Sequence, residues 1–269
     1  TIRNPARSSN QNPLGNSNTF VGCRLSSQQF RPYIRKSLRK SLRESNIIRS
    51  PIIFTMSNPY FRFKQFTVFH DKCAMKVGAD GVTLGAWADI TNAKKMLDIG
   101  CGSGLIALMV AQRSNAEITA IDIDNQSVIQ STINVENSPW KERIIIRQIS
   151  LQDFAECTSE KFDVIISNPP FFRNSLKNPS QGRTVARHAD TLPHEQLLIC
   201  SKKLLNPGGR LCIILPIAEG EDCVKTGKEA GLFCSRKVNV FPNTVKQPKR
   251  LLLEFVMTET ACRKSNLTI

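Results

Sequence analysis

The chain has 269 residues and a formal charge of +15, with 41% hydrophobic and 22% charged residues. These proportions are typical of a globular protein and exclude a chain with too little apolar side chain to fold. Its apolar runs fall short of the roughly 18 residues that cross a membrane, so the sequence predicts no membrane partner.

Residues 1–55 carry most of the positive charge, +9 against +6 for the remainder. Their Ser, Asn, Arg and Pro content predicts a disordered basic tail, because little apolar surface offsets the entropy of ordering. The composition resembles an organellar transit peptide and also suits a nucleic-acid-binding arm. We favour a third interpretation, in which Met56 is the true start and the tail is translated from upstream sequence.

The nine cysteines form no Cys-x-x-Cys pair, and several, such as Cys212, lie in apolar strand-like runs. This pattern predicts reduced core cysteines of an intracellular protein, with neither a disulfide framework nor a metal site. We expect a cytoplasmic location, or an organellar one if residues 1–55 are a genuine targeting segment.

From about residue 94, predicted strands and helices alternate. Strands are expected at residues 95–99, 117–123, 143–149, 162–167 and 210–216, and helices from residue 105, over 125–137 with Asn125 as N-cap, over 192–205 and over 219–230. Two last strands, 234–241 and 250–257, have no helix between them and are expected to pair antiparallel. Alternation of this kind predicts an α/β fold, a mostly parallel sheet with helices on both faces.

The first predicted strand leads into a glycine-rich loop, Asp98-Ile99-Gly100-Cys101-Gly102-Ser103-Gly104. Glycines allow a tight turn and a close approach of a ligand to the backbone, and N–H groups at the next helix start face that ligand. The third glycine comes one residue earlier than in dinucleotide-binding loops. This D-x-G-x-G-x-G pattern resembles the cofactor loop of class I methyltransferases. The resemblance implies S-adenosylmethionine as cofactor, with Asp98, Gly100, Gly102 and Gly104 at its site.

Two further carboxylates are candidates for the same ligand. Asp122 ends the second predicted strand, where it can accept hydrogen bonds from both ribose hydroxyls. We favour it over Asp124, which we expect to begin the next turn; a solvated strand end is the alternative. Asp153 follows the third predicted strand, where the resemblance implies contact with the adenine of the cofactor. The alternative for Asp153 is a helix cap.

After the fourth predicted strand comes Asn168-Pro169-Pro170-Phe171. It resembles the N-P-P-[FYW] motif of methyltransferases that act on planar amino groups. Such an amine is a poor nucleophile because its lone pair is delocalised. The Asn168 side-chain oxygen and the Pro169 carbonyl can accept its two N–H bonds and orient it, Pro170 stiffens the turn, and the Phe171 ring can stack on the base. Asn168 would also adjoin the cofactor. A Pro-rich loop is the alternative.

Several flanking segments resemble one bacterial family, the tRNA1(Val) (adenine(37)-N6)-methyltransferases, over about residues 57–258. They are Phe61-Arg62-Phe63-Lys64-Gln65-Phe66, Cys73-Ala74-Met75-Lys76-Val77-Gly78, Asp80-Gly81-Val82-Thr83-Leu84-Gly85-Ala86-Trp87, Ala186-Arg187-His188-Ala189-Asp190 and Pro248-Lys249-Arg250-Leu251-Leu252-Leu253-Glu254-Phe255. The resemblance implies a Rossmann-like class I methyltransferase domain over residues 56–258, with a seven-stranded mostly parallel sheet, an antiparallel C-terminal hairpin and a tail over 259–269. It implies N6-methylation of adenine 37 of tRNA(Val), with the anticodon loop as partner.

The modest charge of residues 56–269 means that RNA contacts must be clustered. The basic candidates are Lys72, Lys76, Arg173, Lys177, Arg183, Arg187, Lys246, Lys249 and Arg250. We expect His188 to order the loop after the motif rather than to act as a base, since this route needs no strong base.

Three alternative functions stay open. A protein glutamine methyltransferase of release factors usually has Tyr after the prolines and a helical N-terminal domain. A non-catalytic RNA-binding relative would be free to lose the Asn168 motif or the glycine loop. A DNA adenine methyltransferase would need a target-recognition domain, for which little chain remains.

Overall fold

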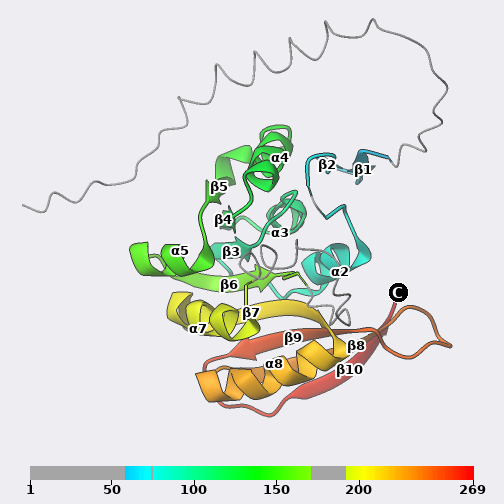
Figure 1. Ribbon diagram of the computed structural model, residues 1–269, viewed down its shortest axis with the longest axis vertical. Helices are drawn as coiled ribbons and strands as arrows, with labels where there is room; N and C mark the ends of the chain where they lie inside the picture. Colours follow the sequence, from blue (N-terminus) through cyan, green and yellow to red (C-terminus); the bar gives the residue numbers. More distant parts are fainter. Residues whose placement is uncertain (1–57, 74, 171–191) are drawn as a thin grey trace, which may run out of the picture. The chain divides into compact units, whose positions relative to one another are not determined.

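The computed structural model describes residues 58–73, 75–170 and 192–269 (Figure 1). The predicted basic tail lies outside the described residues, as do Phe171, His188 and four of the RNA-contact candidates, Arg173, Lys177, Arg183 and Arg187. None of the described helices is long and apolar enough to cross a bilayer.

One sheet of eight strands has the order β10-β8-β9-β7-β6-β3-β4-β5, and β1 and β2 form a separate antiparallel pair. The strands are β1 (Tyr60–Arg62), β2 (Thr67–Phe69), β3 (Lys95–Ile99), β4 (Glu117–Asp122), β5 (Ile144–Gln148), β6 (Phe162–Ser167), β7 (Leu205–Pro216), β8 (Phe233–Phe241), β9 (Arg250–Val256) and β10 (Arg263–Thr268). β3 to β7 run parallel, whereas β9 is antiparallel to both β7 and β8. The α/β class and the antiparallel C-terminal hairpin are confirmed.

The described helices connect the parallel strands in the predicted alternation. They are α2 (Ala79–Trp87), α3 (Leu105–Arg113), α4 (Asn125–Glu136), the 3-10 turn η1 (Lys141–Arg143), α5 (Leu151–Cys157), α7 (His194–Leu204) and α8 (Ile217–Ala230). Figure 1 shows α7 and α8 side by side along one face of the sheet, and the two helices pack on each other.

Neighbouring side chains of each central strand enter different cores. In β3, Met96 packs in a core that includes α2, α3 and α4, whereas Leu97 packs in a second core with α5, α7 and α8. In β6, Ile166 and Ile165 divide in the same way, because successive strand residues point to opposite faces. Burying such a side chain contributes about 1.5–3 kcal/mol. Burial on both faces explains why the centre of β6, Val164-Ile165-Ile166, is continuously apolar.

The sheet has eight strands rather than seven, because residues 259–269, expected to be a tail, contain β10. This strand pairs in parallel with β8, from Arg263 opposite Arg236 to Thr268 opposite Phe241. Five of its six side chains are exposed. An edge strand whose side chains are mostly exposed lacks the alternation of apolar and polar residues from which a strand is predicted.

Several element boundaries differ from the prediction for local reasons. The N-cap of α4 is Asp124 rather than Asn125, and its carboxylate accepts from Ser127 N–H at 2.8 Å. β7 begins at Leu205 and continues through the predicted stop, since Gly208 adopts a left-handed φ of 78° and the pairing with β6 shifts register there. Such a bulge absorbs extra residues without ending the strand. The pattern also missed α2, whose two internal glycines weaken its helical signal.

Candidate active site

The glycine loop and the Asn168 motif begin at the same edge of two adjacent strands. β3 and β6 are paired in parallel with Ile99 opposite Ser167, so Gly100 and Asn168 both follow the carboxyl end of a strand. Ser167 Oγ donates to the Ile99 carbonyl at 3.0 Å and ties the two ends together. Ligands of open α/β sheets bind in the crevice outside these carboxyl ends.

The glycines of the loop divide into two roles. Gly100 and Gly102 have φ values of 68° and 53°, and a Cβ built on either would meet nothing within 4 Å. They form an open cradle, where the backbone can approach a ligand. Gly104 is the N-cap of α3, and a Cβ there would lie 3.2 Å from Ser131 Cβ. It therefore allows α4 to pack closely on the loop and does not line the pocket.

Asp98 lies behind the loop rather than in the pocket. It is 2% exposed, and its Oδ2 accepts from Ala107 N–H in the first turn of α3 at 3.0 Å. Burial raises the pKa of Asp98 to about 7, against the opposing effect of the Ala107 hydrogen bond. The other oxygen, Oδ1, has no hydrogen-bond partner among the described residues. Any effect of Asp98 on cofactor binding is therefore expected to act through the loop.

Asp122 contacts the loop directly. Its Oδ2 accepts from Gly102 N–H at 2.8 Å and its Oδ1 from Asp124 N–H at 2.9 Å. Burial raises its pKa, and these backbone hydrogen bonds oppose the shift. Of the two acids considered from the sequence, Asp122 faces the glycine loop and Asp124 caps α4.

Asp153 lies in the first turn of α5, not in a loop. Ser150 is the N-cap of α5, its Oγ accepts from Asp153 N–H at 3.0 Å, and it donates to Asp153 Oδ2 at 2.7 Å. This reciprocal pairing stabilises a helix start. The described pocket is lined by other residues, so the capping alternative accounts for the position of Asp153, and its contact with a cofactor adenine stays a prediction.

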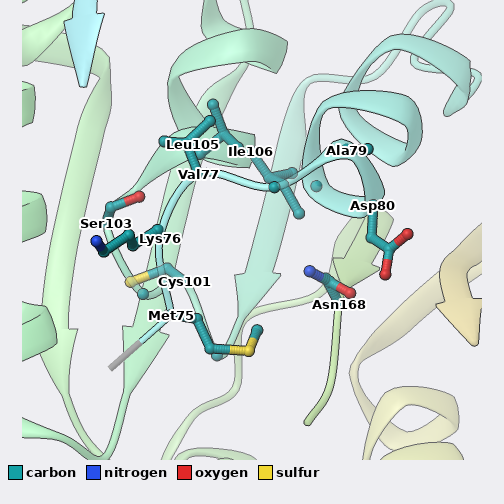
Figure 2. Close-up of a pocket in the computed structure, with 14 residues that line it drawn as sticks. Met75, Lys76, Val77, Ala79, Asp80, Cys101, Ser103, Leu105, Ile106 and Asn168 are labelled. Carbon is teal, nitrogen blue, oxygen red and sulfur yellow. The ribbon is translucent and has the colours of Figure 1, made fainter. Parts of the chain in front are cut away.

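Asn168 lies at the pocket with its side-chain oxygen unsatisfied. The residue is half-buried, Pro169 is buried and Pro170 is exposed. Asn168 Oδ1 is buried and has no hydrogen-bond partner among the described residues. The pocket wall is completed by the segment before and within α2. Its lining residues are Met75, Lys76, Val77, Gly78, Ala79, Asp80, Gly81, Gly100, Cys101, Gly102, Ser103, Leu105, Ile106 and Asn168 (Figure 2).

Asn134 is a residue of this site that the sequence did not reveal. It is buried in α4, where its Oδ1 accepts from Phe69 N–H at 2.9 Å and its Nδ2 donates to the Phe69 and Ser103 carbonyls, both at 2.8 Å. One side chain thus joins β2 to the glycine loop. Gln130 Oε1, one turn earlier, accepts from Lys72 N–H at 3.1 Å. The signal in the sequence that could have revealed Asn134 was a polar residue on a helix face expected to be buried.

The described RNA-contact candidates lie in different surroundings. Lys246 and Lys249 belong to the connection from β8 to β9, which lies at the pocket edge of the sheet because Arg250 pairs opposite Pro216, the last residue of β7. Arg250 is committed to an ion pair with Asp80, Nε to Oδ2, at 2.8 Å. Lys76 lines the pocket itself. Among the described residues, no group of three His, Cys, Asp or Glu could hold a metal ion.

Solved methyltransferases share this fold. A predicted O-methyltransferase of Agrobacterium tumefaciens superposes with a TM-score of 0.53 and 17% identity, covering 70% of this chain and 85% of that one. A methyltransferase of Pyrococcus furiosus has a TM-score of 0.50 and 20% identity, covering 86% and 98%. At these identities the likeness establishes the fold alone.

Sequence similarity is closer and more specific. The methyltransferase small domain family model matches residues 86–218. A protein of Parabacteroides distasonis is 48% identical, covering 78% of this chain and 89% of its own length, and one of Bacteroides thetaiotaomicron is 49% identical, covering 79% and 90%. Both are named tRNA1(Val) (adenine(37)-N6)-methyltransferase. The chain belongs to the tRNA1(Val) (adenine(37)-N6)-methyltransferase family.

Proposed function

We propose that this protein methylates N6 of an adenine in tRNA, with adenine 37 of tRNA(Val) as the target. The observation that carries the proposal is the Asn168 Oδ1, which is buried at the pocket without a partner among the described residues. Leaving a buried acceptor unsatisfied costs about 1–3 kcal/mol. An N–H of an incoming exocyclic amine would donate a hydrogen bond to this oxygen. The oxygen would then be satisfied only while the substrate is bound.

The described residues fit S-adenosylmethionine. Gly100 and Gly102 leave open space where a ligand can meet the backbone, and Leu105 and Ile106 supply apolar wall beside them. Asp122, whose Oδ2 accepts from Gly102 N–H of the loop, is proposed to accept from the ribose hydroxyls. When bound, the cofactor supplies an electrophilic methyl group on its sulfonium sulfur.

The protein contributes to catalysis by holding the amine. The Asn168 side-chain oxygen and the Pro169 carbonyl accept its two N–H bonds, so the nitrogen lone pair is directed at the methyl group instead of into the ring. Such preorganised acceptors act by orientation and by electrostatic complementarity to the transition state. Phe171, outside the described residues, is proposed to stack on the target base.

The anticodon loop is the proposed docking partner, and neither a metal nor a membrane is required. A base in an RNA loop is already partly unstacked, so its entry into the pocket costs less than extraction from a duplex. Lys246 and Lys249, on the connection beside the pocket edge, are suited to neighbouring phosphates. We place the activity in the cytoplasm, with the tRNA pool.

Transfer from radiolabelled cofactor to tRNA(Val) transcripts tests the proposal. N6-methyladenosine is expected in the transcript with adenine at position 37, and none is expected when that base is inosine, which lacks the amine. Nucleoside mass spectrometry locates the product. Methylation of a release factor instead of tRNA would favour the protein glutamine alternative, and cofactor binding without transfer to either would favour a non-catalytic relative.

A further inference from the structure

Asn168 shares its end of the pocket with a carboxylate. Asp80 lies in the first turn of α2 and lines the same pocket. A Cβ built on the neighbouring Gly81 would lie 3.9 Å from Asn168 Nδ2, so the start of α2 is in van der Waals reach of the Asn168 amide. Figure 2 draws the Asp80 and Asn168 side chains toward one end of the pocket, away from Cys101 and Ser103.

Arg250 fixes the Asp80 carboxylate in this position. The first residue of β9 donates through Nε to Asp80 Oδ2 at 2.8 Å, and the two side chains are 29% and 26% exposed. The contact spans 170 residues of sequence and attaches the start of α2 to the sheet. Partial burial reduces the screening of such a pair by water and salt.

The reaction releases a proton that such a group can accept. As the N–C bond forms and the S–C bond breaks, the electrons of the broken bond stay on sulfur and the nitrogen becomes cationic. The nitrogen must then lose a proton, and the electrons of that N–H bond return to it. The Asn168 amide and the Pro169 carbonyl can accept a hydrogen bond but are too weakly basic to keep the proton. Among the described residues that line the pocket, Asp80 is the one carboxylate.

We propose that Asp80, positioned by Arg250, stabilises the cationic nitrogen and receives its proton. The inference rests on the proposed function and deepens it. A ring-conjugated ammonium is a far stronger acid than a carboxylic acid, so a carboxylate beside it can take the proton. The negative charge of Asp80 also favours an amine over a keto group at this position, because the carboxylate would repel a keto oxygen.

Two isosteric variants separate this role from anchoring. Asp80→Asn keeps the size and an acceptor for Arg250 Nε but removes the charge and the basicity. The matched control is Asp89→Asn, which weakens the ion pair of Asp89 with Arg210 (2.6 Å) just beyond the other end of α2, outside the pocket. The measurements are single-turnover methyl transfer to tRNA(Val) at saturating cofactor, the Kd of the cofactor, the KM for tRNA and the Tm.

Positioned acid–base groups contribute about 10²–10⁴-fold, and we expect Asp80→Asn to slow single-turnover transfer by about 100-fold. The cofactor Kd, the KM for tRNA and the Tm should stay near their native values, and Asp89→Asn should transfer at a near-native rate. The inference is overturned by transfer within about threefold of native in Asp80→Asn, by an equal loss in Asp89→Asn, or by weakened cofactor binding that accounts for the loss. A native protein that methylates no tRNA would overturn the proposed function itself, whereas the three outcomes above leave that function standing.

Discussion

The unsatisfied oxygen of Asn168 predicts that this side chain is needed for methyl transfer. Asn168→Ala should slow single-turnover transfer by about 100- to 1000-fold, the range for losing one preorganised polar group at a transition state. The Kd of the cofactor should change little, since the loss falls on the reacting amine. Stability should be unchanged or slightly higher, because the variant removes a buried acceptor that has no partner among the described residues. Near-native transfer by this variant would mean that the amine is held elsewhere.

The raised pKa of Asp98 predicts that the stability of the folded state depends on pH. Its pKa is raised to about 7 from an ordinary value of 3.8, so the folded protein binds a proton there that the unfolded chain releases. Between about pH 4 and pH 7 the folded state loses stability as pH rises, and above pH 7 this loss is complete. Asp98→Asn cannot titrate. Its Tm relative to the native protein should therefore rise from pH 5 to pH 7 and level off above.

The pH series has an internal control. The amide introduced by Asp98→Asn retains an acceptor for Ala107 N–H, so any constant offset in Tm reports packing, and only the pH-dependent part reports titration. The full effect is on the order of a few kcal/mol, because each tenfold change in proton affinity corresponds to about 1.4 kcal/mol. Parallel Tm curves for the two proteins from pH 5 to pH 8 would show that Asp98 is ionised throughout.

Residue positions could be predicted from sequence where one local turn decides them. Asn168, Gly100, Gly102 and Asp122 lie at the carboxyl ends of neighbouring strands, as expected. Sequence spacing does not tell whether an acid before a loop faces the ligand or the N–H groups of the next helix, and Asp98 faces the helix. Roles that depend on distant partners, such as Asp80 with Arg250, need the packed structure.

At the scale of elements, α4 positions both the lead-in segment and the glycine loop through Asn134. Asn134→Ala removes the part-buried hydrogen bonds to Phe69 and the buried one to the Ser103 carbonyl. We expect a loss of about 1–3 kcal/mol in the free energy of unfolding. The cofactor Kd should also rise, because the segment after β2 forms the pocket wall from Met75 onward.

Asn137→Ala is the control on the same helix. Asn137 is the exposed C-cap, and among the described residues its side chain bonds within the helix, to the Ile133 carbonyl at 2.8 Å. It should cost less than about 0.5 kcal/mol, as surface substitutions do, and leave the cofactor Kd unchanged. Equal effects of the two variants on the Kd would show that α4 acts by its general stability and not through Asn134.

At the scale of the whole molecule, the pattern of elements predicted the architecture well because each central strand is buried on both faces. Short apolar runs such as 164–166 are typical of parallel strands that are covered on both faces. The eighth strand escaped prediction for the opposite reason. β10 buries almost nothing, so only its pairing with β8 reveals it. The same physical effect, burial, therefore decides both what the sequence predicts and what it leaves out.

Removing residues 1–55 tests the interpretation of the basic tail. Every described helix and strand begins after Asn58, so the Tm should stay within about 2 °C of the native value and single-turnover transfer should remain near native.

Deletion also removes +9 of the +15 formal charge. If those residues form a nucleic-acid-binding arm, the affinity for tRNA should fall most at low salt, and the slope of log Kd against log salt should become shallower. We expect equal slopes for the full and shortened chains, measured from 50 to 300 mM salt by filter binding, because the pocket and its basic edge lie outside the deleted segment. A shallower slope in the shortened chain would establish the arm, whereas a sharp fall in Tm would make the segment part of the folded enzyme.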